Sequence, residues 1–360
     1  MKIYFVCGED SGDLHAANLA MQIKKNSEKI KMRGFGGNKM KDCGVEIAAH
    51  IKGLSFMGIS SIFLRLPSLI RFLNFCKKDI IDYKPDAIIL IDYPGFNLKI
   101  AKFASKHGIK VFYYIPPKVW ASRRGRIDII RKYVDHLIVI FPFEVDFYKN
   151  HGVQAHYFGN PITDEISKGI DPINLNTDKK VIALLPGSRD HEIRNNLPVM
   201  ASITSNFSDY KFIVASTSGT YDLCSNLLLG TDLEVVKDKT YSVLKESEAA
   251  IVTSGTSTLE AALINVPQIV CYKTDMVTFY LARLLISIKW ISLVNIILNK
   301  SLVNELIQKD VTSSNLTLEL QNILSKEGRS KIHLGYNHLS KIIGNDLVSS
   351  NLSSFILSKI

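Results

Sequence analysis

The sequence predicts an α/β protein made of two doubly wound domains that face each other across a cleft. Its 360 residues are about twice the length of a common single domain. In both halves, short runs rich in β-branched and aromatic residues alternate with segments of helical period, as in parallel sheets covered by helices. Between the halves, residues 169–180 are polar and rich in turn-forming residues, so we expect a linker there.

The first domain is expected over residues 1–168 and begins directly with a strand. The run Ala87–Ile91 is apolar throughout, which is typical of a strand buried on both faces of a parallel sheet. The expected strands are Lys2–Cys7, Met32–Phe35, Ala87–Ile91, Lys110–Tyr114, His136–Ile140 and His156–Phe158. The expected helices between them are Leu14–Lys25, Pro67–Asp82 and Leu98–His107.

The second domain is expected over residues 181–330, with its own series of strands. These strands are Val181–Leu185, Phe212–Ser216, Leu233–Val236, Ala250–Thr253 and Gln268–Tyr272. Beyond about residue 300 the pattern is helical. We expect residues 331–360 to form C-terminal helices that pack back on the first domain or on a partner.

Composition limits the class of partner. Hydrophobic residues at 46% and charged residues at 22% fit a globular protein and exclude a disordered or disulfide-scaffolded one. A net charge of +10 favours phosphorylated substrates or an anionic membrane surface. The basic residues are spread along the chain without a recognised motif, so no nucleic acid is expected. The five cysteines show no CxxC spacing and the histidines no zinc-site spacing, so we expect reduced cytoplasmic thiols, no metal and no cofactor.

Two apolar stretches, Phe56–Cys76 and Phe279–Leu298, are tested against a membrane-spanning role. The first contains Arg65 and Arg71, and the second also carries basic residues near its centre. Each central charge opposes insertion by about 2.5–3.5 kcal/mol. We therefore expect neither stretch to cross a bilayer. The apolar run at the N-terminus is too short for a signal peptide.

The turn after the first strand, Gly8–Asp13, is a candidate ligand loop. Its glycines allow a ligand to approach the backbone, and the helix start offers unpaired N–H groups. It does not match the G-x-G-x-x-G fingerprint, so it does not indicate a dinucleotide site. A plain helix N-cap is the alternative interpretation. The residues expected to line this loop are Glu9, Ser11, Gly12 and Asp13.

Asp92 directly follows the buried strand Ala87–Ile91 and precedes a turn fixed by Pro94. A carboxylate at the carboxyl end of a buried strand is held rigidly, as a general base must be. Partial desolvation there would raise its pKa toward neutrality. The alternative is that Asp92 caps the following helix.

Two turns of the second domain suit a nucleoside diphosphate. Leu184–Arg189 ends a strand with a small-residue turn and an arginine at a helix start, and backbone N–H groups with a guanidinium would hold a diphosphate. In Thr253–Glu260, hydroxyl residues again precede a helix, and Glu260 could accept both ribose hydroxyls. A plain turn with a solvated arginine is the alternative. The expected binding residues are Gly187, Ser188, Arg189, Ser254, Gly255, Thr256, Ser257 and Glu260.

In order and spacing, these segments resemble the lipid-A-disaccharide synthases over residues 1 to about 310. The resemblance is carried by Gly8–Asp13, Ile91–Asn97, Tyr114–Ala121, Pro142–Glu144, Leu184–Arg189 and Ser254–Glu260. It implies the GT-B fold, with two Rossmann-like domains, and an inverting glycosyltransferase of lipid A synthesis. The implied substrates are UDP-2,3-diacylglucosamine as donor and 2,3-diacylglucosamine 1-phosphate, lipid X, as acceptor. The products are the β-1,6-linked disaccharide 1-phosphate and UDP.

The resemblance also implies roles for particular residues. Asp92 matches the family's essential aspartate and Arg189 its essential arginine. Asn295 and Glu305 match polar residues near the donor, as does Gln308, and Asn97 lies on the acceptor side. The chain departs from the family pattern at Gly95, where many members have aspartate, and also at Asn160 and at Ser122.

An apolar segment with interspersed cations, at about 56–78, is expected to dip into the membrane interface. Substrates with two acyl chains would otherwise leave the bilayer at about 0.8 kcal/mol per exposed CH₂ group. A buried core helix is the alternative. The residues expected in this patch are Met57, Ile59, Ile62, Phe63, Leu66, Leu69 and Leu73.

The implied mechanism is direct displacement. Asp92 removes the proton of the acceptor 6-hydroxyl, and Arg189 with the turn at Ser254 and Gly255 stabilises the leaving diphosphate without a required metal. The implied location is cytoplasmic, at the inner leaflet of the inner membrane, and a homodimer is among the expected partners. Two alternatives stay open. One is another UDP-sugar enzyme of this architecture, such as a UDP-hexosamine 2-epimerase or an N-acetylglucosaminyltransferase, and the other is a non-catalytic protein that binds nucleotide and membrane.

Overall fold

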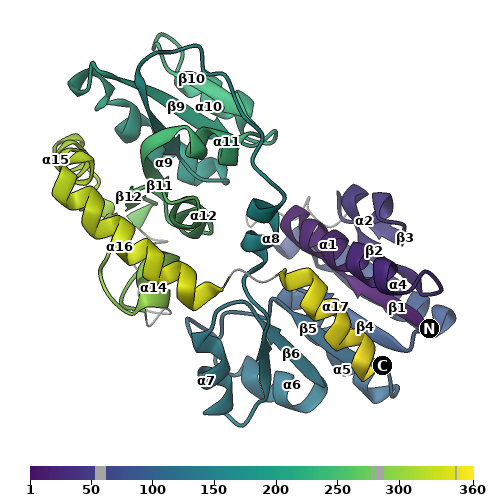
Figure 1. Cartoon of the computed structure of the whole chain (residues 1–360). Helices are drawn as coiled ribbons and strands as arrows, with labels where there is room; N and C mark the ends of the chain where they lie inside the picture. Colours follow the sequence, from purple (N-terminus) through teal and green to yellow (C-terminus); the bar gives the residue numbers. More distant parts are fainter. Residues whose placement is uncertain (53–61, 277–278, 280–287, 345–346) are drawn as a thin grey trace. The chain divides into compact units, whose positions relative to one another are not determined.

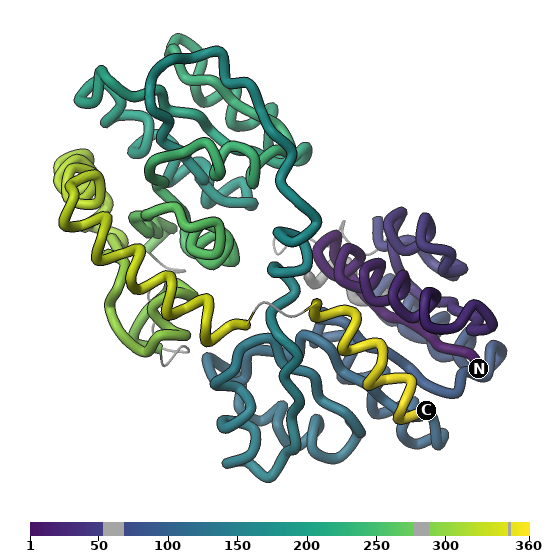
Figure 2. Tube along the Cα trace, in the orientation of Figure 1, coloured from purple at the N-terminus to yellow at the C-terminus, as the bar shows by residue number. Residues whose placement is uncertain are grey.

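The computed structural model describes residues 1–52, 62–276, 279, 288–344 and 347–360, with the side chains of 62–67 left out. The chain forms two compact units (Figures 1 and 2). Unit 1 comprises Met1–Asp164 and Asn345–Ile360, and unit 2 comprises Glu165–Gly344. Residues 169–179 form neither helix nor strand, and β8 begins at Lys180.

Unit 1 contains a seven-stranded parallel sheet in the order β3-β2-β1-β4-β5-β6-β7. Its strands are β1 (Lys2–Val6), β2 (Lys31–Gly36), β3 (Glu46–His50), β4 (Ala87–Ile91), β5 (Lys110–Tyr114), β6 (His136–Val139) and β7 (Ala155–Tyr157). Its helices are α1 (Asp10–Asn26), α2 (Asn38–Asp42), α4 (Ile62–Tyr83), α5 (Pro94–Lys106), α6 (Arg126–Tyr133), α7 (Phe143–Lys149) and α17 (Val348–Lys359), and α8 (Pro161–Ser167) spans the boundary between the units.

The sheet of unit 1 is buried on both faces. On one face, Tyr4 and Val6 of β1 pack with residues of α4 and α5. On the other face, Ile3 and Phe5 pack with α1 and with Leu352 of α17. Because neighbouring residues of a strand point to opposite faces, a strand covered on both sides must be apolar throughout, as β4 is.

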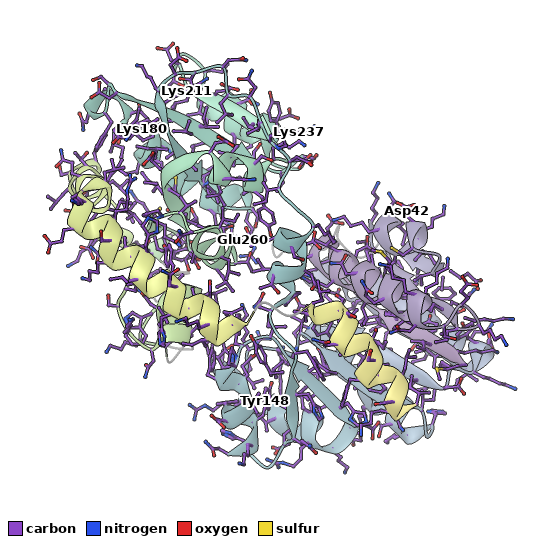
Figure 3. All side chains as sticks on the ribbon, in the orientation of Figure 1. Asp42, Tyr148, Lys180, Lys211, Lys237 and Glu260 are labelled. Atoms are coloured by element: carbon purple, nitrogen blue, oxygen red, sulfur yellow. The ribbon has the colours of Figure 1, made fainter. Side chains whose placement is uncertain are left out.

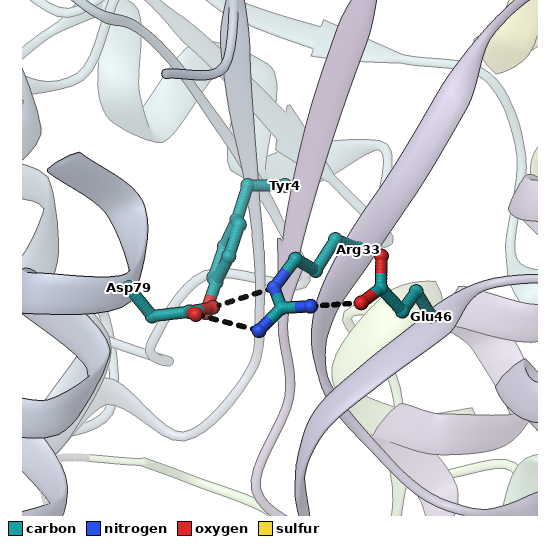
Figure 4. Close-up of polar contacts among 4 residues, drawn as sticks. All are labelled: Tyr4, Arg33, Glu46 and Asp79. Carbon is teal, nitrogen blue, oxygen red and sulfur yellow. Dashed lines mark hydrogen bonds and ion pairs between the residues drawn. The ribbon is translucent and has the colours of Figure 1, made fainter. Parts of the chain in front are cut away.

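A polar network, buried at Tyr4 and Asp79 and exposed at Glu46, ties three strands to α4 (Figure 4). The Arg33 guanidinium on β2 donates two hydrogen bonds to Asp79 on α4, at 2.7 and 3.0 Å. The Tyr4 hydroxyl on β1 donates to the same carboxylate at 2.6 Å, and Arg33 also pairs with Glu46 on β3. Burial by itself would raise the pKa of Asp79, but the bonds from Arg33 and Tyr4 outweigh it and lower the pKa.

Unit 2 contains a six-stranded parallel sheet in the order β10-β9-β8-β11-β12-β13. Its strands are β8 (Lys180–Leu185), β9 (Tyr210–Ser216), β10 (Glu234–Lys237), β11 (Ser247–Thr253), β12 (Gln268–Tyr272) and β13 (Glu305–Ile307). Its helices are α9 (Asp190–Ala201), α10 (Tyr221–Leu227), α11 (Thr240–Lys245), α12 (Ser257–Leu263), α14 (Leu293–Leu298), α15 (Ser313–Leu324) and α16 (Lys326–Ile343), with short 3₁₀ turns at Thr204–Asn206 and Gln308–Asp310.

Both sheets reverse their strand order at one point. In unit 1 the reversal lies between β1 and β4, and in unit 2 it lies between β8 and β11. Open α/β sheets bind ligands beyond the carboxyl ends of the strands at such a point. The turns that follow these four strands are therefore where each unit is expected to hold its ligand.

Two strands and several helix starts differ from the sequence prediction. β3 and β13 were not expected, and the region beyond residue 300 is helical only after β13. α1 begins at Asp10, so Asp13 lies within the helix. Of the C-terminal residues, α16 belongs to unit 2 and only α17 belongs to unit 1. Within the described part of the chain, no helix combines the length and the hydropathy needed to cross a bilayer.

Candidate active site

Asp92 lies at the carboxyl end of β4 in a strained backbone conformation. Asp92 and Tyr93 both have left-handed φ angles, 47° and 45°. Such angles are unfavourable for residues other than glycine and persist where the surrounding structure imposes them. Two hydrogen bonds hold this conformation. The Asp92 carbonyl accepts them from the Asn97 side chain at 2.8 Å and from the Tyr113 hydroxyl at 2.9 Å.

The charge of the Asp92 side chain is tuned by its surroundings. Burial, with a smaller contribution from the Glu9 carboxylate, raises its pKa to about 6, against the opposing effects of the Tyr93 backbone N–H and Lys118. A carboxylate with this pKa is ionised at neutral pH and is a stronger base than an exposed aspartate. Asp92 therefore has the protonation behaviour that proton abstraction from a hydroxyl requires.

The loop after β1 packs directly against this turn. A Cβ atom on Gly8 would come within 2.4 Å of the Tyr93 ring, so glycine is needed for the two turns to meet. Glu9 and Ser11 are exposed at the start of α1. These two residues of the expected ligand loop are accessible to a ligand.

Three residues expected to contact ligand on this side are instead buried in the fold of unit 1. Asp13 is buried, and its carboxylate accepts the backbone N–H groups of Gly37, Lys39 and Met40 at 2.6–3.3 Å, so it caps α2. Gly12 is likewise buried inside α1. Asn97 is fully buried, and its amide joins the ends of β1 and β4. We therefore correct the expectation that Asp13 and Asn97 contact the acceptor. Asp13 holds the start of α2, and Asn97 holds the turn at Asp92.

Sequence reasoning gave no role to Glu144 and Lys118, although both lie in segments that carried the resemblance. Glu144 is buried and accepts the Trp120 indole N–H at 2.9 Å and two backbone N–H groups of the β6–α7 turn. Burial raises the pKa of Glu144 to about 7. Desolvation lowers the pKa of Lys118, while Glu144 and Asp92 raise it, so its ammonium lies in the field of both carboxylates. Lys118 thus links Asp92 to Glu144 electrostatically.

In unit 2, the turn after β8 is shaped by Glu192, a residue that sequence reasoning missed. Gly187 has a left-handed φ of 115°, and a Cβ atom there would lie 2.7 Å from the Glu192 carboxylate. That carboxylate accepts the Ser188 backbone N–H at 3.3 Å and one Arg189 nitrogen at 3.0 Å. The Arg189 side chain is still 67% exposed. Glu192 therefore orients Arg189 while leaving most of its guanidinium open to an anion.

The turn after β11 is anchored by its hydroxyl groups. The Ser254 hydroxyl donates to the Ile291 carbonyl at 2.8 Å, and the Thr258 hydroxyl donates to the Gly255 carbonyl at 2.8 Å. Gly255 and Thr256 are exposed, with Ser257 half-buried beside them. A Cβ atom on Gly255 would meet nothing within 4 Å, so there is open space beside this backbone.

Glu260, labelled in Figure 3, lies on α12. Burial raises its pKa to about 7. No hydrogen-bond donor or cation pairs with it among the residues that the structure describes. An unpaired, desolvated carboxylate is unfavourable in the free protein, and a donor on a ligand relieves that cost.

Asn295 and Glu305 form one buried network rather than an open surface. The Asn295 amide donates to the Val303 carbonyl and to Glu305, both at 2.8 Å. The Glu305 carboxylate also accepts the backbone N–H groups of Ile291 and Ser292 at 2.9 Å. Gln308 similarly bonds both backbone groups of Thr274. Asn295 and Glu305 thus hold the 291–305 segment in place. The Ser254 hydroxyl is hydrogen-bonded to the first residue of that segment, Ile291.

The expected membrane patch is described only in part. Met57 and Ile59 lie outside the described residues, as do the side chains of Ile62, Phe63 and Leu66. Leu73 is buried in the core of unit 1 and Leu69 packs against that core, so for these two the expectation is corrected. Among the α4 side chains that the structure describes, the exposed large apolar residues are Ile70, Phe75 and Ile81.

Comparisons with known proteins show which proteins the chain resembles. The family model described as lipid-A-disaccharide synthetase matches residues 3–356. The lipid-A-disaccharide synthase of Geobacter sulfurreducens is 33% identical, with 99% of this chain and 96% of that protein covered. That of Nitrosococcus oceani is 36% identical, with 91% and 88% covered.

Solved structures resemble the chain in fold. A glycosyltransferase of kitacinnamycin matches with a TM-score of 0.69 at 11% identity, covering 99% of this chain and 98% of that one. The UDP-GlcNAc 2-epimerase of Neisseria meningitidis, bound to UDP-GlcNAc, matches with a TM-score of 0.68 at 12% identity, covering 100% and 99%. The two parallel-sheet units thus have the GT-B fold, as the sequence predicted.

Proposed function

Since the chain belongs to the lipid-A-disaccharide synthase family of glycosyltransferases, we propose that it joins UDP-2,3-diacylglucosamine to 2,3-diacylglucosamine 1-phosphate with inversion at the anomeric carbon. The acceptor 6-hydroxyl attacks the donor sugar from the face opposite UDP. The products are the β-1,6-linked disaccharide 1-phosphate and UDP.

The observation that carries this proposal is the state of Asp92. The carboxylate follows β4 at the switch point of the unit 1 sheet, in a strained turn, with burial raising its pKa to about 6. As the acceptor hydroxyl attacks, its proton becomes acidic, and Asp92 accepts it. Removing a general base of this kind lowers the rate by about 10²–10⁴-fold.

The leaving diphosphate is assigned to the two turns of unit 2. Arg189, oriented by Glu192, supplies a fixed positive charge, and the exposed backbone of Gly255 and Thr256 supplies N–H dipoles. Glu260 is assigned to the ribose hydroxyls, whose O–H groups would donate to its half-buried, unpaired carboxylate. Together, these groups stabilise charge that develops as the glycosidic bond to UDP breaks.

We assign the enzyme to the inner leaflet of the inner membrane as a peripheral protein. Support comes from α4, whose exposed side includes apolar Ile70 and Phe75 beside the exposed cations Arg71 and Lys78. An apolar strip flanked by cations favours an anionic membrane surface. Both acyl-bearing substrates can then stay in the bilayer during the reaction.

Mass analysis of the product formed from the two diacyl substrates tests the proposal. The wild-type enzyme is expected to give one disaccharide 1-phosphate per UDP, and Asp92→Asn and Arg189→Ala each to lower the rate at least about 10²-fold. The control is Arg194→Ala, because Arg194 is an exposed arginine of the neighbouring helix α9, and this variant should keep the wild-type rate.

Two results would contradict the proposal. A normal rate for Asp92→Asn would remove the base from the mechanism. Conversion of the UDP-sugar donor to its 2-epimer, without any disaccharide, would instead assign the chain to the epimerase reaction.

A further inference from the structure

Arg123 and Arg126, beyond the end of β5, form a pair of cations without a countercharge. Neither guanidinium has a hydrogen-bond or ion-pair partner within the described part of the chain. Arg126 is half-buried, and Arg123 is exposed with a left-handed φ of 56°. Burial lowers the pKa of Arg126, and the nearby Arg123 charge lowers it further, so the two side chains repel each other.

The local backbone adds to this excess of positive charge. Arg126 is the first residue of α6, and a cation is unfavourable beside the positive end of a helix dipole. The acidic residue of the first turn, Asp128, is already paired with Arg131 at 2.9 Å. Gly125 at the N-cap provides no capping side chain. Nothing in this part of the protein compensates the two arginines, so an anion bound there would be stabilised by both.

The arginine pair follows β5, which pairs in parallel with β4, so the pair and Asp92 both lie beyond the carboxyl ends of neighbouring strands. Tyr113 connects the two, because its hydroxyl donates to the Asp92 carbonyl at 2.9 Å. Burial and the Asp92 carboxylate raise the pKa of Tyr113, while Arg126 lowers it, so this hydroxyl lies in the fields of both groups. Lys118, the other cation of this region, is shared between Asp92 and Glu144. Arg123 and Arg126, with the exposed Arg124 between them, thus remain to meet an incoming anion.

We propose that Arg123 and Arg126 bind the phosphomonoester of the acceptor sugar while its hydroxyl lies at Asp92. This inference rests on the proposed function, in which the acceptor is a hexosamine 1-phosphate. The reacting 6-hydroxyl and the 1-phosphate belong to the same sugar. When the hydroxyl lies at Asp92, the phosphate therefore lies about one sugar ring away and needs a binding group there. Arginine suits this task because its planar fork bonds two phosphate oxygens at once.

The decisive measurement is the preference for a phosphorylated acceptor. Rates are measured in detergent micelles with 2,3-diacylglucosamine 1-phosphate and with the same sugar lacking phosphate. Arg123→Gln and Arg126→Gln are each expected to lower kcat/KM for the phosphorylated acceptor about 10- to 100-fold, mainly through KM. With the unphosphorylated acceptor, both variants should match the wild-type rate. A defect in folding or in the chemical step would lower both rates together.

Arg124→Gln is the matched control, because it removes the same charge from the same turn. Arg124 is exposed and does not perturb Arg126. It should keep the wild-type preference. The inference is overturned if Arg123→Gln and Arg126→Gln also keep that preference, or if they lose activity equally with both acceptors.

Two further measurements separate this inference from its alternatives. Thermal stabilisation by glucosamine 1-phosphate, a soluble probe, should be present in the wild type and lost in Arg126→Gln. The wild type could make no disaccharide and still be stabilised by glucosamine 1-phosphate in a way that depends on Arg126. In that case the proposed function is wrong, but the anion site at Arg123 and Arg126 is supported. Binding to vesicles containing phosphatidylglycerol should be equal in both proteins. Loss of vesicle binding with an unchanged acceptor preference would assign the arginines to lipid headgroups and overturn the inference.

Discussion

At the residue scale, the turn at Asp92 combines backbone strain with a shifted pKa. Two consecutive residues with left-handed φ angles hold the carboxylate beyond the end of the sheet. The side-chain amide of Asn97 stabilises that conformation by donating a hydrogen bond to the Asp92 carbonyl. The sequence predicted Asp92 because a polar residue at the end of an apolar strand is visible in the pattern. It could not show that Asn97 and Asp13 face inward, because a hydrogen-bonding side chain suits a ligand and a backbone equally well.

The pH dependence of catalysis follows from the neighbours of Asp92. Because the base must be ionised, kcat/KM should rise with pH through a midpoint near the pKa of about 6. Lys118→Met removes a cation that lowers this pKa, so the midpoint should move to higher pH. Glu9→Gln removes an anion that raises it, so the midpoint should move to lower pH. Steady-state rates across the pH range check these shifts.

Lys99→Met provides the control for this series, since Lys99 is an exposed lysine of α5 that does not perturb Asp92. Its midpoint should equal that of the wild type. A profile without an acidic limb, or shifts of the same sign for Lys118→Met and Glu9→Gln, would contradict the assignment of Asp92 as the titrating base.

At the element scale, the sequence predicted most of the parallel strands, including the edge strands β7 and β10, and missed β3 and β13 at the opposite edges of the two sheets. β3 contains Glu46, two alanines and His50, and it is half-exposed along its length. β13 has only three residues. Strands at an edge need no continuous apolar run, so periodicity alone cannot distinguish them from loops. Their positions follow from pairing with β2 and β12, which only the fold reveals.

The network of Tyr4, Arg33 and Asp79 should stabilise unit 1 measurably. Asp79→Asn leaves Arg33 without its buried partner and should lower the free energy of unfolding by about 2–4 kcal/mol at neutral pH. Because the fold lowers the pKa of Asp79, this stabilisation is present above the usual carboxyl pKa of about 4 and is lost as pH falls further. Urea unfolding at neutral pH and at about pH 3 tests both points.

The Arg33 pair with Glu46 supplies the control, because the Glu46 side chain is 64% exposed. Glu46→Gln should change stability by less than about 1 kcal/mol. An equal loss for Glu46→Gln and Asp79→Asn, or an Asp79→Asn loss that persists undiminished in acid, would show that the buried bonds are not the source of stability.

At the scale of the whole molecule, α17 joins the last residues of the chain to the first unit. Leu352 and Ile356 are fully buried in the unit 1 core, and the Asp164 carboxylate accepts the backbone N–H groups of Val348 and Ser349 at 2.8 and 2.9 Å. The sequence predicted a helix here, but it left open whether that helix packs on the first domain or on a partner. The pattern of an amphipathic helix shows which of its faces is buried but not which surface it packs against, so this choice depends on tertiary packing.

Leu352→Ala should therefore destabilise unit 1 selectively, by about 2–5 kcal/mol, because it leaves a cavity in that core. Hydrogen exchange read by mass spectrometry should show faster exchange in β1 and α1 and an unchanged pattern in unit 2. Leu347→Ala, at a leucine that is 59% exposed, should leave both units unaffected. Equal loosening of both units by Leu352→Ala would contradict an independent core.

The docking of α17 also bears on how the protein is made in the cell. During translation, the strands of the first sheet leave the ribosome long before α17, and all of the second unit is synthesised in between. Until then, the groove that Leu352 and Ile356 will fill stays open on the nascent chain. The first unit to be synthesised is thus the last to be completed, and its uncovered face is a natural target for chaperones during that interval.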